Sequence, residues 1–403
     1  MSAEPDEIRW VPVGEVGEVR MGKQLSPASK DAPGQMPYLR VANVFEGRID
    51  YRDVNSMGFT DAEKVIYSLR PGDILLNEGQ ESLTNVGRSA VYDGMPDSIC
   101  FQNTLIRFRA SGSVVPEYAQ AVFVNWRRMG IFARVAEKTS ISHLGGSRFA
   151  RMMFPLVPRR GQCRIVEILD AVTGSEQVAL EEVAKLRTIR KVLVEQISRF
   201  EYVPMVNIIV DGPRNGIYKP EGHYGESGTP IVRINSFDGG PSNLTRGLLR
   251  VKVSDSEVRR YGIVVGDVLI NRVNTPGLVG KSTVVSDLVE ATLFESNIMR
   301  CRIDSSKIHP KIVEAWLSGS VVRAHFASRT KPAVSQASIN RSDVFSCPIP
   351  KMDSGEQSEF LEKLEAIDLA IFESQARVVK LAQLRKGLTG DLLGVASSAV
   401  AQA

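Results

Sequence analysis

LRPGDILLNEGQESLTNVGRSAVYD at residues 69–93 and IVVGDVLINRVNTPGLVGKSTVVSD at residues 263–287 decide the fold of this 403-residue chain. In both stretches a Gly-Asp turn leads into a short apolar strand that ends in asparagine, and a second strand returns after a glycine-containing loop. The two stretches therefore predict the same pair of strands twice in one chain.

Further segments of the sequence repeat in the same order, at an offset of about 193 residues. The paired segments are 37–49 with 230–240, 101–109 with 294–302, 115–126 with 308–319, and 154–158 with 347–350. An ordered set of matches at one offset indicates the tandem duplication of a whole unit.

Each copy is predicted to be an α+β domain with a mostly β core. Short alternating apolar segments broken by glycine and proline are typical of strands, and about 150 residues is a normal domain size. The segments that follow Pro116 and Pro310 are predicted to be helices, because proline suits the first turn of a helix.

Residues 161–199 and 354–390 contain no proline and are rich in leucine, isoleucine, valine and charged residues. In the second stretch Leu364, Ile371 and Val378 are spaced by seven. This spacing predicts two long helices, each with a coiled-coil-like apolar stripe. Gly174 disfavours the first of them slightly, by about 1 kcal/mol.

The ends of the second long helix are marked in the sequence. Ser354 and Gln357 fit a capping box, and Gly390 fits the end of the helix. The simplest burial for the two stripes is an antiparallel pair, which would form a rigid spacer of about 55 Å. The alternative is that each helix packs separately on its own domain.

The composition is that of a soluble globular protein, with 43% hydrophobic and 24% charged residues. No apolar run reaches the roughly 18 residues of a membrane span, and the acidic start MSAEPDEIRW does not fit a signal peptide. Four cysteines far apart in the sequence predict reduced thiols rather than a zinc site or a disulfide framework. We therefore expect a cytoplasmic location.

The charge balance is a weak indication of nucleic-acid binding. The net charge is only +4, although 34 of the 50 basic residues are arginine. Arginine can grip a phosphate or a guanine edge with two hydrogen bonds, but ordinary codon bias is an alternative explanation. A protein this weakly basic would hold DNA poorly alone, so partners would supply part of the grip.

The sequence carries no recognisable catalytic motif. A DNA methyltransferase needs a glycine-rich cofactor loop and an Asn-Pro-Pro-Tyr-like motif, and neither is present. Gly280-Lys281-Ser282 lacks the correctly spaced first glycine of a phosphate-binding loop. Four isolated histidines disfavour a metal hydrolase. We therefore expect a non-catalytic chain without metal or cofactor, and a nuclease with scattered carboxylates stays open as an alternative.

The order domain, long helix, domain, long helix resembles the specificity subunits of type I restriction-modification systems, the HsdS family. The residues that carry the resemblance are GDILLNEG and GDVLINRV in the two domains, FPLVP and CPIP before the helices, and LRKGLTGDLLG near the end. The resemblance covers nearly the whole chain, from about Trp10 to Gly394. It implies target-recognition domains at 1–158 and 203–350, spacer helices at 159–202 and 351–394, and a disordered tail at 395–403.

The resemblance also implies a function. The two domains would each read one half of a split, asymmetric site in double-stranded DNA. The helices would set the distance between the half-sites and dock two methyltransferase subunits, which bind S-adenosylmethionine, and restriction subunits would join the complex. A scaffold in another defence complex that reuses this architecture is the alternative.

Base reading needs side chains with fixed donors and acceptors, and two loops in each domain offer them. The first loops are 77–89 and 271–282, where Arg88 and Lys281 occupy equivalent places; a solvated hairpin tip is the alternative. The second loops are 137–149 and 328–343. Arg40 and Arg233 match in a nearby strand, where a structural arginine–carboxylate pair is the alternative. The candidate DNA-binding residues are Arg40, Asn43, Asn85, Arg88, Ser140, His143, Arg148, Arg233, Asn235, Arg272, Asn274, Lys281, Lys331, Gln336 and Ser338.

Overall fold

The computed structural model describes residues 8–80, 85–94, 98–136, 142–237, 242–275, 277–332 and 337–393. The chain forms two compact units: unit 1 comprises residues 1–178 and 377–403, and unit 2 comprises residues 179–376. Each unit contains one globular lobe and one segment of each of two long helices. We call residues 8–158 the first lobe and residues 200–352 the second lobe.

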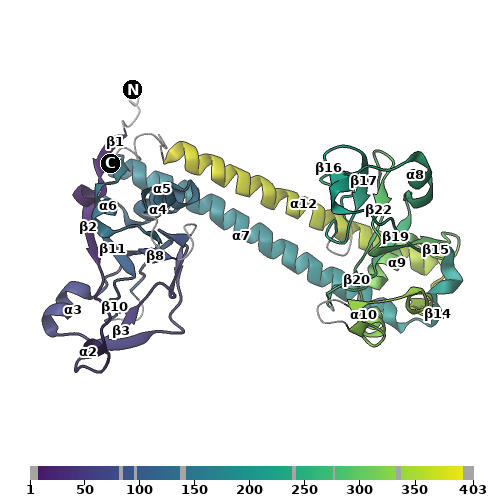
Figure 1. Cartoon of the computed structure of the whole chain (residues 1–403), viewed down its shortest axis with the longest axis horizontal. Helices are drawn as coiled ribbons and strands as arrows, with labels where there is room; N and C mark the ends of the chain where they lie inside the picture. The colour runs from purple at the N-terminus through teal and green to yellow at the C-terminus, as the bar shows by residue number, and fades with distance from the viewer. Residues whose placement is uncertain are drawn as a thin grey trace. The chain divides into compact units, whose positions relative to one another are not determined.

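The first lobe is built on a four-stranded antiparallel sheet (Figure 1). Its strands, in order, are β2 (Gly17–Met21), β11 (Leu105–Ala110), β7 (Ile74–Asn77) and β9 (Ser89–Val91). Helix α4 (Pro116–Arg128) packs on this sheet through a buried aromatic cluster that includes Phe108, Phe123 and Trp126.

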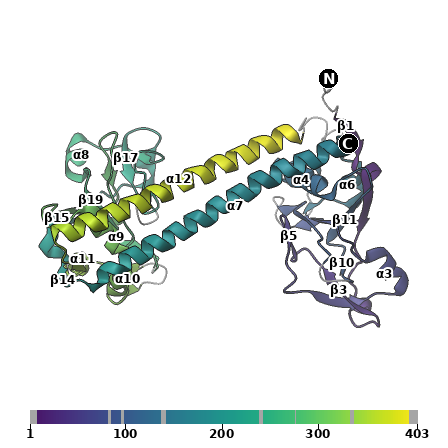
Figure 2. The same ribbon diagram turned by 180° about the vertical axis from the view of Figure 1, so that it is seen from behind.

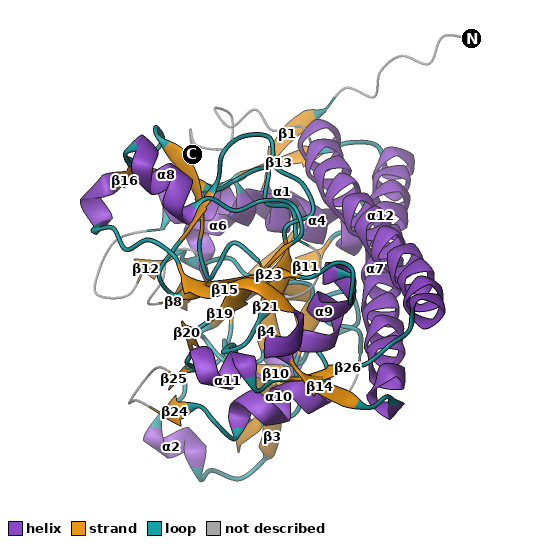
Figure 3. Ribbon diagram, turned by 90° about the vertical axis from the view of Figure 1, so that its right-hand side faces the viewer, coloured by secondary structure: helices purple, strands orange, loops and turns teal. Residues whose placement is uncertain are grey.

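The second lobe repeats this sheet. Its strands, in order, are β15 (Ile209–Asn215), β23 (Ile298–Ile303), β19 (Asp267–Asn271) and β21 (Ser282–Val284), again antiparallel. Helix α9 (Pro310–Leu317) packs on β19 and β21, and Figure 3 shows it in purple beside the orange strands.

Each lobe also has a smaller sheet and a closing strand pair. The smaller sheets are β10 (Cys100–Phe101), β3 (Gln35–Leu39) and β6 (Asn55–Gly58) in the first lobe, and β16 (Tyr224–Gly225), β18 (Leu249–Val251), β17 (Thr229–Val232) and β22 (Leu293–Phe294) in the second. The closing pairs are β1 (Arg9–Pro12) with β13 (Met153–Leu156), and β14 (Tyr202–Pro204) with β26 (Pro348–Pro350). The predicted duplication of an α+β unit is confirmed.

The remaining elements are short. They include the helices α1 (Val13–Val16), α2 (Pro27–Lys30), α3 (Asp61–Tyr67), α5 (Ile131–Val135), α6 (Gly146–Arg151), α8 (Asp255–Tyr261), α10 (Ser320–Ala327) and α11 (Arg341–Phe345), and the strand pair β4 (Val44–Phe45) and β5 (Arg48–Ile49).

The Gly-Asp turn of each repeat is a structural element. Asp73 is buried; its carboxylate accepts a hydrogen bond from the backbone N–H of Arg70 at 2.8 Å and two from Arg109, both at 2.7 Å. In the second lobe the buried Asp267 accepts from the backbone N–H of Val264 at 2.9 Å and from Arg302 Nε at 3.0 Å. This shared bond pattern explains why the motif recurs in the sequence.

The two long helices are α7 (Arg159–Gln196) and α12 (Ser354–Leu392). Gly174 lies inside α7, and α12 continues past Gly390 to Leu392, so the predicted end at Gly390 is wrong by two residues. The predicted capping box is wrong by one residue. Asp353 and Glu356 form it, because each backbone N–H donates to the other's carboxylate at 2.8 and 2.9 Å.

In each unit a segment of α7 packs along a segment of α12 (Figures 1 and 2). In unit 1 Ile165, near the start of α7, shares a core with Leu393 just after α12, and Glu176 pairs with Arg385 at 2.7 Å. In unit 2 Arg190 pairs with Asp368 at 2.7 Å. The start of α7 thus meets the end of α12, and the predicted antiparallel pairing is confirmed.

The boundary between the two units lies within the long helices, after Val178 in α7 and after Ala376 in α12, rather than at their ends. The predicted tail at 395–403 lies outside the described residues. Within the described ranges, none of the helices combines the length and the apolar character that crossing a bilayer requires.

Candidate nucleic-acid interface

The structure brings the two predicted loops of each lobe together. In the first lobe β8 (Gly79–Gln80) pairs antiparallel with β12 (Ser142–His143). In the second lobe β20 (Val273–Asn274) pairs with β25 (Ala337–Ser338), which also pairs with β24 (Lys331–Pro332). Because loops far apart in the sequence pair as short strands in both lobes, each lobe presents one combined loop surface.

In the first lobe this surface is organised by Glu78 and His143. The His143 Nδ1 atom lies 2.7 Å from Glu78 Oε2, and the imidazole side chain keeps 43% of its surface exposed. Arg148 lies just behind, where its guanidinium donates to the backbone oxygens of Leu144 and His143 at 3.0 and 3.3 Å. Arg148 therefore supports the loop through backbone contacts.

In the second lobe Arg272, Asn274 and Ser338 lie on the corresponding surface, and all three are half-buried. The backbone oxygen of Arg272 accepts from the N–H of Ile339 at 3.0 Å, which joins the two loops. The Asn274 side chain accepts from the backbone N–H of Thr275 at 2.8 Å, so it shapes the local turn.

Arg88 and Lys281, the equivalent cations of the first loops, both lie over a phenylalanine ring. The Arg88 guanidinium lies 4.9 Å from the centre of the Phe45 ring, and the Lys281 ammonium lies 5.3 Å from that of Phe237. Cations over aromatic rings are held in place by attraction to the ring, and the Arg88 guanidinium also donates to the backbone oxygen of Val41 at 3.3 Å. The same construction in both lobes makes these residues the strongest phosphate-contact candidates.

Three arginines near Arg88 were missed by the sequence analysis. Arg48 pairs with Phe45 across the β4–β5 strands, and its guanidinium lies 4.4 Å from the centre of the Phe45 ring. Arg127 and Arg128 both bind Glu46. Burial lowers the pKa of Arg88, and the neighbouring Arg127 lowers it further. The Arg127-Arg128 pair gave no clear signal, because basic residues are ordinary at the end of a helix.

Glu46 is the acidic centre of this cluster. Burial alone would raise the pKa of its carboxyl group, but the hydrogen bonds from Arg128 and Arg127 hold that pKa below the ordinary value of 4.5. The carboxylate therefore neutralises part of a positive patch formed by four arginines.

Arg40 and Asn43 form a structural network. The Arg40 guanidinium binds Asp53 Oδ2 at 2.7 Å, and the buried Asn43 amide donates to the backbone oxygens of Asp50 and Asp53 at 3.0 and 2.8 Å. Asn43 also accepts from the backbone N–H of Arg40 at 3.0 Å. Arg40 therefore forms the structural arginine–carboxylate pair that the sequence left open as the alternative to DNA binding.

Arg233 pairs with Glu295 at 3.1 Å, which again matches the arginine–carboxylate alternative. The backbone N–H of Arg233 donates to Ser236 Oγ at 2.9 Å, so Ser236 takes the role that Asn43 has in the first lobe. Asn235, a further candidate close to Arg233 in the sequence, is exposed on the turn.

The remaining candidates are one half-buried asparagine and three residues whose side chains the structure does not describe. Asn85 is half-buried, and its backbone oxygen accepts from the N–H of Arg88 at 3.2 Å. Ser140, Gln336 and the side chain of Lys331 lie outside what the structure describes.

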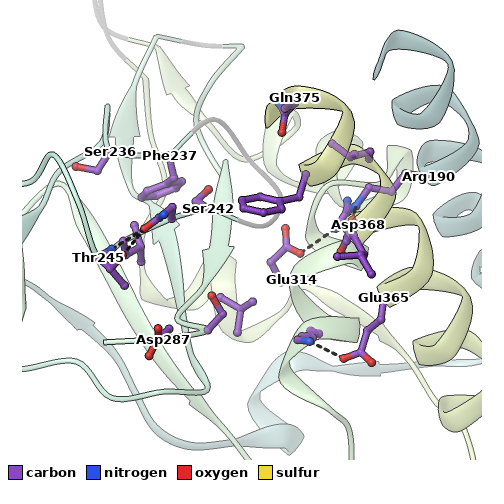
Figure 4. A pocket seen from close by; sticks show the side chains of 18 of the residues that line it. Arg190, Ser236, Phe237, Ser242, Thr245, Asp287, Glu314, Glu365, Asp368 and Gln375 are labelled. Atoms are coloured by element: carbon purple, nitrogen blue, oxygen red, sulfur yellow. Dashed lines mark hydrogen bonds and ion pairs between the residues drawn. The ribbon is translucent and has the colours of Figure 1, made fainter. Parts of the chain in front are cut away.

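Unit 2 also contains a pocket of about 890 Å³ between the second lobe and the long-helix segments (Figure 4). One wall carries Phe237 and Thr245 and the other carries Phe372 and Gln375. At its edge Arg190 joins the buried Glu314 at 3.1 Å to Asp368 at 2.7 Å. Burial raises the pKa of Asp368 in spite of this arginine.

Within the described ranges, the structure has no group of three or more His, Cys, Asp and Glu side chains that could hold a metal ion. Among the cysteines, Cys100, Cys301 and Cys347 are buried and Cys163 is exposed, and burial raises the pKa of Cys347 to about 12.

Comparison with solved structures supports the same architecture. The S subunit of a type I restriction-modification system from M. genitalium aligns over 98% of both chains with a TM-score of 0.55 and 12% identity. The chain has the fold of a type I specificity subunit. A second match is a chain from a structure of complex assembly and conformational transition of the type I R-M system. Its TM-score is 0.60 at 14% identity, and the match covers 98% of this chain and 99% of that one.

Sequence comparison points to the same group of proteins. The type I restriction enzyme MjaX specificity subunit described in Methanocaldococcus jannaschii is 23% identical over 215 residues. The match spans about half of each chain, 53% of this one and 50% of the relative. No protein-family model matches the chain. The resemblance to specificity subunits that the sequence predicted is confirmed.

Proposed function

We propose that this chain is the DNA sequence-specificity subunit of a type I restriction-modification system and has no catalytic site of its own. The observation that carries the proposal is the duplicated lobe, in which two loops pair as short strands and a cation of the first loop lies over a phenylalanine ring. Two such surfaces in one chain suit a double-stranded DNA site with two halves.

Different loops in the two lobes support an asymmetric site. The backbone frame repeats, whereas the loop residues at 77–89 and 271–282 differ at most positions. Arg88 and Lys281 would contact phosphates, which fixes the position of each lobe without reading sequence, and neighbouring loop side chains would read base edges.

The long helices support a scaffolding role. Large apolar side chains are exposed along both of them: Val178, Leu180, Ile189 and Val192 on α7, and Leu369, Phe372, Val379 and Leu384 on α12. Exposed apolar side chains in such a series suit a protein partner. In the proposed complex these helices dock two methyltransferase subunits, which bring S-adenosylmethionine, and restriction subunits join them in the cytoplasm.

The test is to express the chain in a host together with the methyltransferase subunit and to map methylated adenines by sequencing. A split, asymmetric motif is the expected result. The purified chain should bind duplex DNA weakly, and the assembled complex should bind it tightly. Strong binding of the chain alone to every sequence, or methylation without a motif, would refute the proposal.

Exchange of residues 203–350 for the second domain of another specificity subunit gives the sharper result. It should change one half of the motif and leave the other half and the spacer unchanged. A change in both halves would contradict the division of the chain into two independent readers.

A further inference from the structure

Glu78 and Arg272 occupy the same place in the two lobes and carry opposite charges. Each directly follows the buried asparagine that ends the central strand, Asn77 in β7 and Asn271 in β19. At this point the first loop leaves the sheet and meets the second loop.

The backbone around the two residues is the same. The N–H of Glu78 donates to the oxygen of Thr104 at 3.0 Å, and its own oxygen accepts from the N–H of Leu144 at 2.8 Å. The N–H of Arg272 donates to the oxygen of Asn297 at 2.8 Å, and its oxygen accepts from the N–H of Ile339 at 3.0 Å. The frame is constant and only the side chain differs.

The side-chain surroundings differ in kind. Glu78 is 13% exposed and faces the His143 imidazole at 2.7 Å. The position of His143 in the strand pairing is taken in the second lobe by Ser338, opposite Val273. Among the described residues, the buried Nε atom of Arg272 has no hydrogen-bond partner. A buried guanidinium N–H without a partner is costly, which marks Arg272 as a side chain of this surface that the described part of the lobe leaves unsatisfied.

These contacts give the two lobes opposite hydrogen-bonding character. When Nδ1–H of His143 donates to the Glu78 carboxylate, the neutral ring has an acceptor at Nε2, which suits the amino group of adenine or cytosine. The guanidinium of Arg272 has only donors, and its fork fits O6 and N7 of guanine in the major groove.

We infer that the residues at positions 78 and 272 decide which class of base each lobe reads. Arg272 reads a guanine, and Glu78 positions His143 to accept a hydrogen bond from a base that carries an amino group. This inference rests on the proposed function. It adds the chemical class of base that each lobe reads and the residue that decides it.

The experiment uses the full chain assembled with its methyltransferase subunit and compares methylated motifs for Arg272→Gln and Glu78→Gln. Arg272→Gln should lower the preference for guanine at one position of the second half by about 5- to 150-fold and leave the first half unchanged. Glu78→Gln should relax one position of the first half only. Arg259→Gln, at an exposed arginine of α8 in the same lobe, is the control and should change neither half.

The outcomes separate this inference from the proposed function. If the unaltered complex yields no split motif, the proposed function itself fails. If it yields one and Arg272→Gln keeps both halves, only the inference fails. Equal weakening on all sequences, with a shallower dependence on salt, would assign Arg272 to a phosphate and overturn the inference. The half that each variant should leave unchanged, the first for Arg272→Gln and the second for Glu78→Gln, shows that the variant has folded and assembled.

Discussion

Gln162 and Gln357 make the same three hydrogen bonds at the starts of the two long helices. Gln162 Oε1 accepts from the N–H of Val115 at 2.8 Å, and its Nε2 donates to the oxygens of Ser113 and Val157, both at 2.9 Å. Each glutamine thus ties the first turn of a long helix to the loop that precedes α4 or α9.

In the second lobe Gln357 Oε1 accepts from the N–H of His309 at 3.0 Å, and its Nε2 donates to the oxygens of Lys307 and Met352 at 2.8 and 3.0 Å. The capping-box role predicted for Gln357 is therefore replaced by this contact between helix and lobe. We use the name glutamine joint for this arrangement.

The glutamine joint should contribute measurably to stability. Gln162→Ala should lower the free energy of unfolding of unit 1 by about 2–4 kcal/mol, because the three hydrogen bonds of a buried side-chain amide are lost. Gln357→Ala should cost less, since Gln357 is only half-buried. Urea unfolding followed by hydrogen exchange in each lobe would measure both effects. The exposed Gln24→Ala is the control, and an equal loss there would contradict the role of the joint.

Gly87 should not tolerate a side chain. Its φ of +74° disfavours other residues, and a Cβ atom there would lie 2.1 Å from the Phe132 ring. We expect Gly87→Ala to cost about 3 kcal/mol or more, from backbone strain together with overpacking.

Gly47→Ala separates the two causes. Gly47 has nearly the same φ, +75°, but a Cβ atom there would meet nothing within 4 Å, so only the strain of about 1 kcal/mol remains. Thermal unfolding of both variants gives the comparison. Equal losses would mean that the contact with Phe132 has no effect.

Arg190 holds the second lobe to both helix segments of unit 2. Arg190→Met should destabilise unit 2 by about 3–5 kcal/mol, because the buried Glu314 and the partly buried Asp368 lose their arginine. Calorimetry on the full chain would show a lower melting temperature for this unit.

The double variant Arg190→Met with Glu314→Gln should recover part of that loss. Glutamine is the residue at the matching place in the first lobe, Gln120, whose amide donates to the backbone oxygen of Ser89 at 2.8 Å. The exposed Arg187→Met is the control. Absence of recovery would show that charge burial is not the cause.

Acid should weaken the arginine cluster around Glu46. The pKa of Glu46 in the folded chain lies below its ordinary value of 4.5, so the cluster stabilises unit 1 fully above about pH 4.5. This contribution is lost as the pH falls from 4.5 through the lower folded-state pKa.

Glu46→Gln should therefore unfold with a flatter pH dependence below pH 4.5 than the unaltered chain. Stability measured by urea unfolding between pH 6 and about pH 3 would show the difference. The exposed Glu15→Gln should keep the full pH dependence, and the same flattening there would argue against Glu46 as the source.

The fold could be predicted from the sequence because its signals are local and occur twice. The Gly-Asp turn, the proline before each helix and the heptad spacing each depend on residues close together in the chain. The ends of α12 were less predictable, since Asp353 and Ser354 both suit the start of a helix and only the geometry decides between them.

The candidate site was predictable in position but not in the role of each residue. The loops at 77–89 and 137–149 were recognised by their polar residues, and the structure brings them together. The partner of each arginine lies far away in the sequence: Arg40 pairs with Asp53, whereas Arg88 lies over Phe45 and donates to the backbone oxygen of Val41. Long-range contacts of this kind leave no periodic pattern in the sequence.

The glutamine joint has a consequence for how such genes can change. Both lobes are joined to their long helix by the same three bonds to backbone atoms, and the bonded N–H of Val115 or His309 is one that every residue except proline supplies. A genetic crossover at either glutamine joint would therefore bring in a lobe whose backbone offers the same hydrogen-bonding groups to the glutamine. Under the proposed function, recombination at a joint then yields new combinations of half-sites without any compensating mutation at the junction.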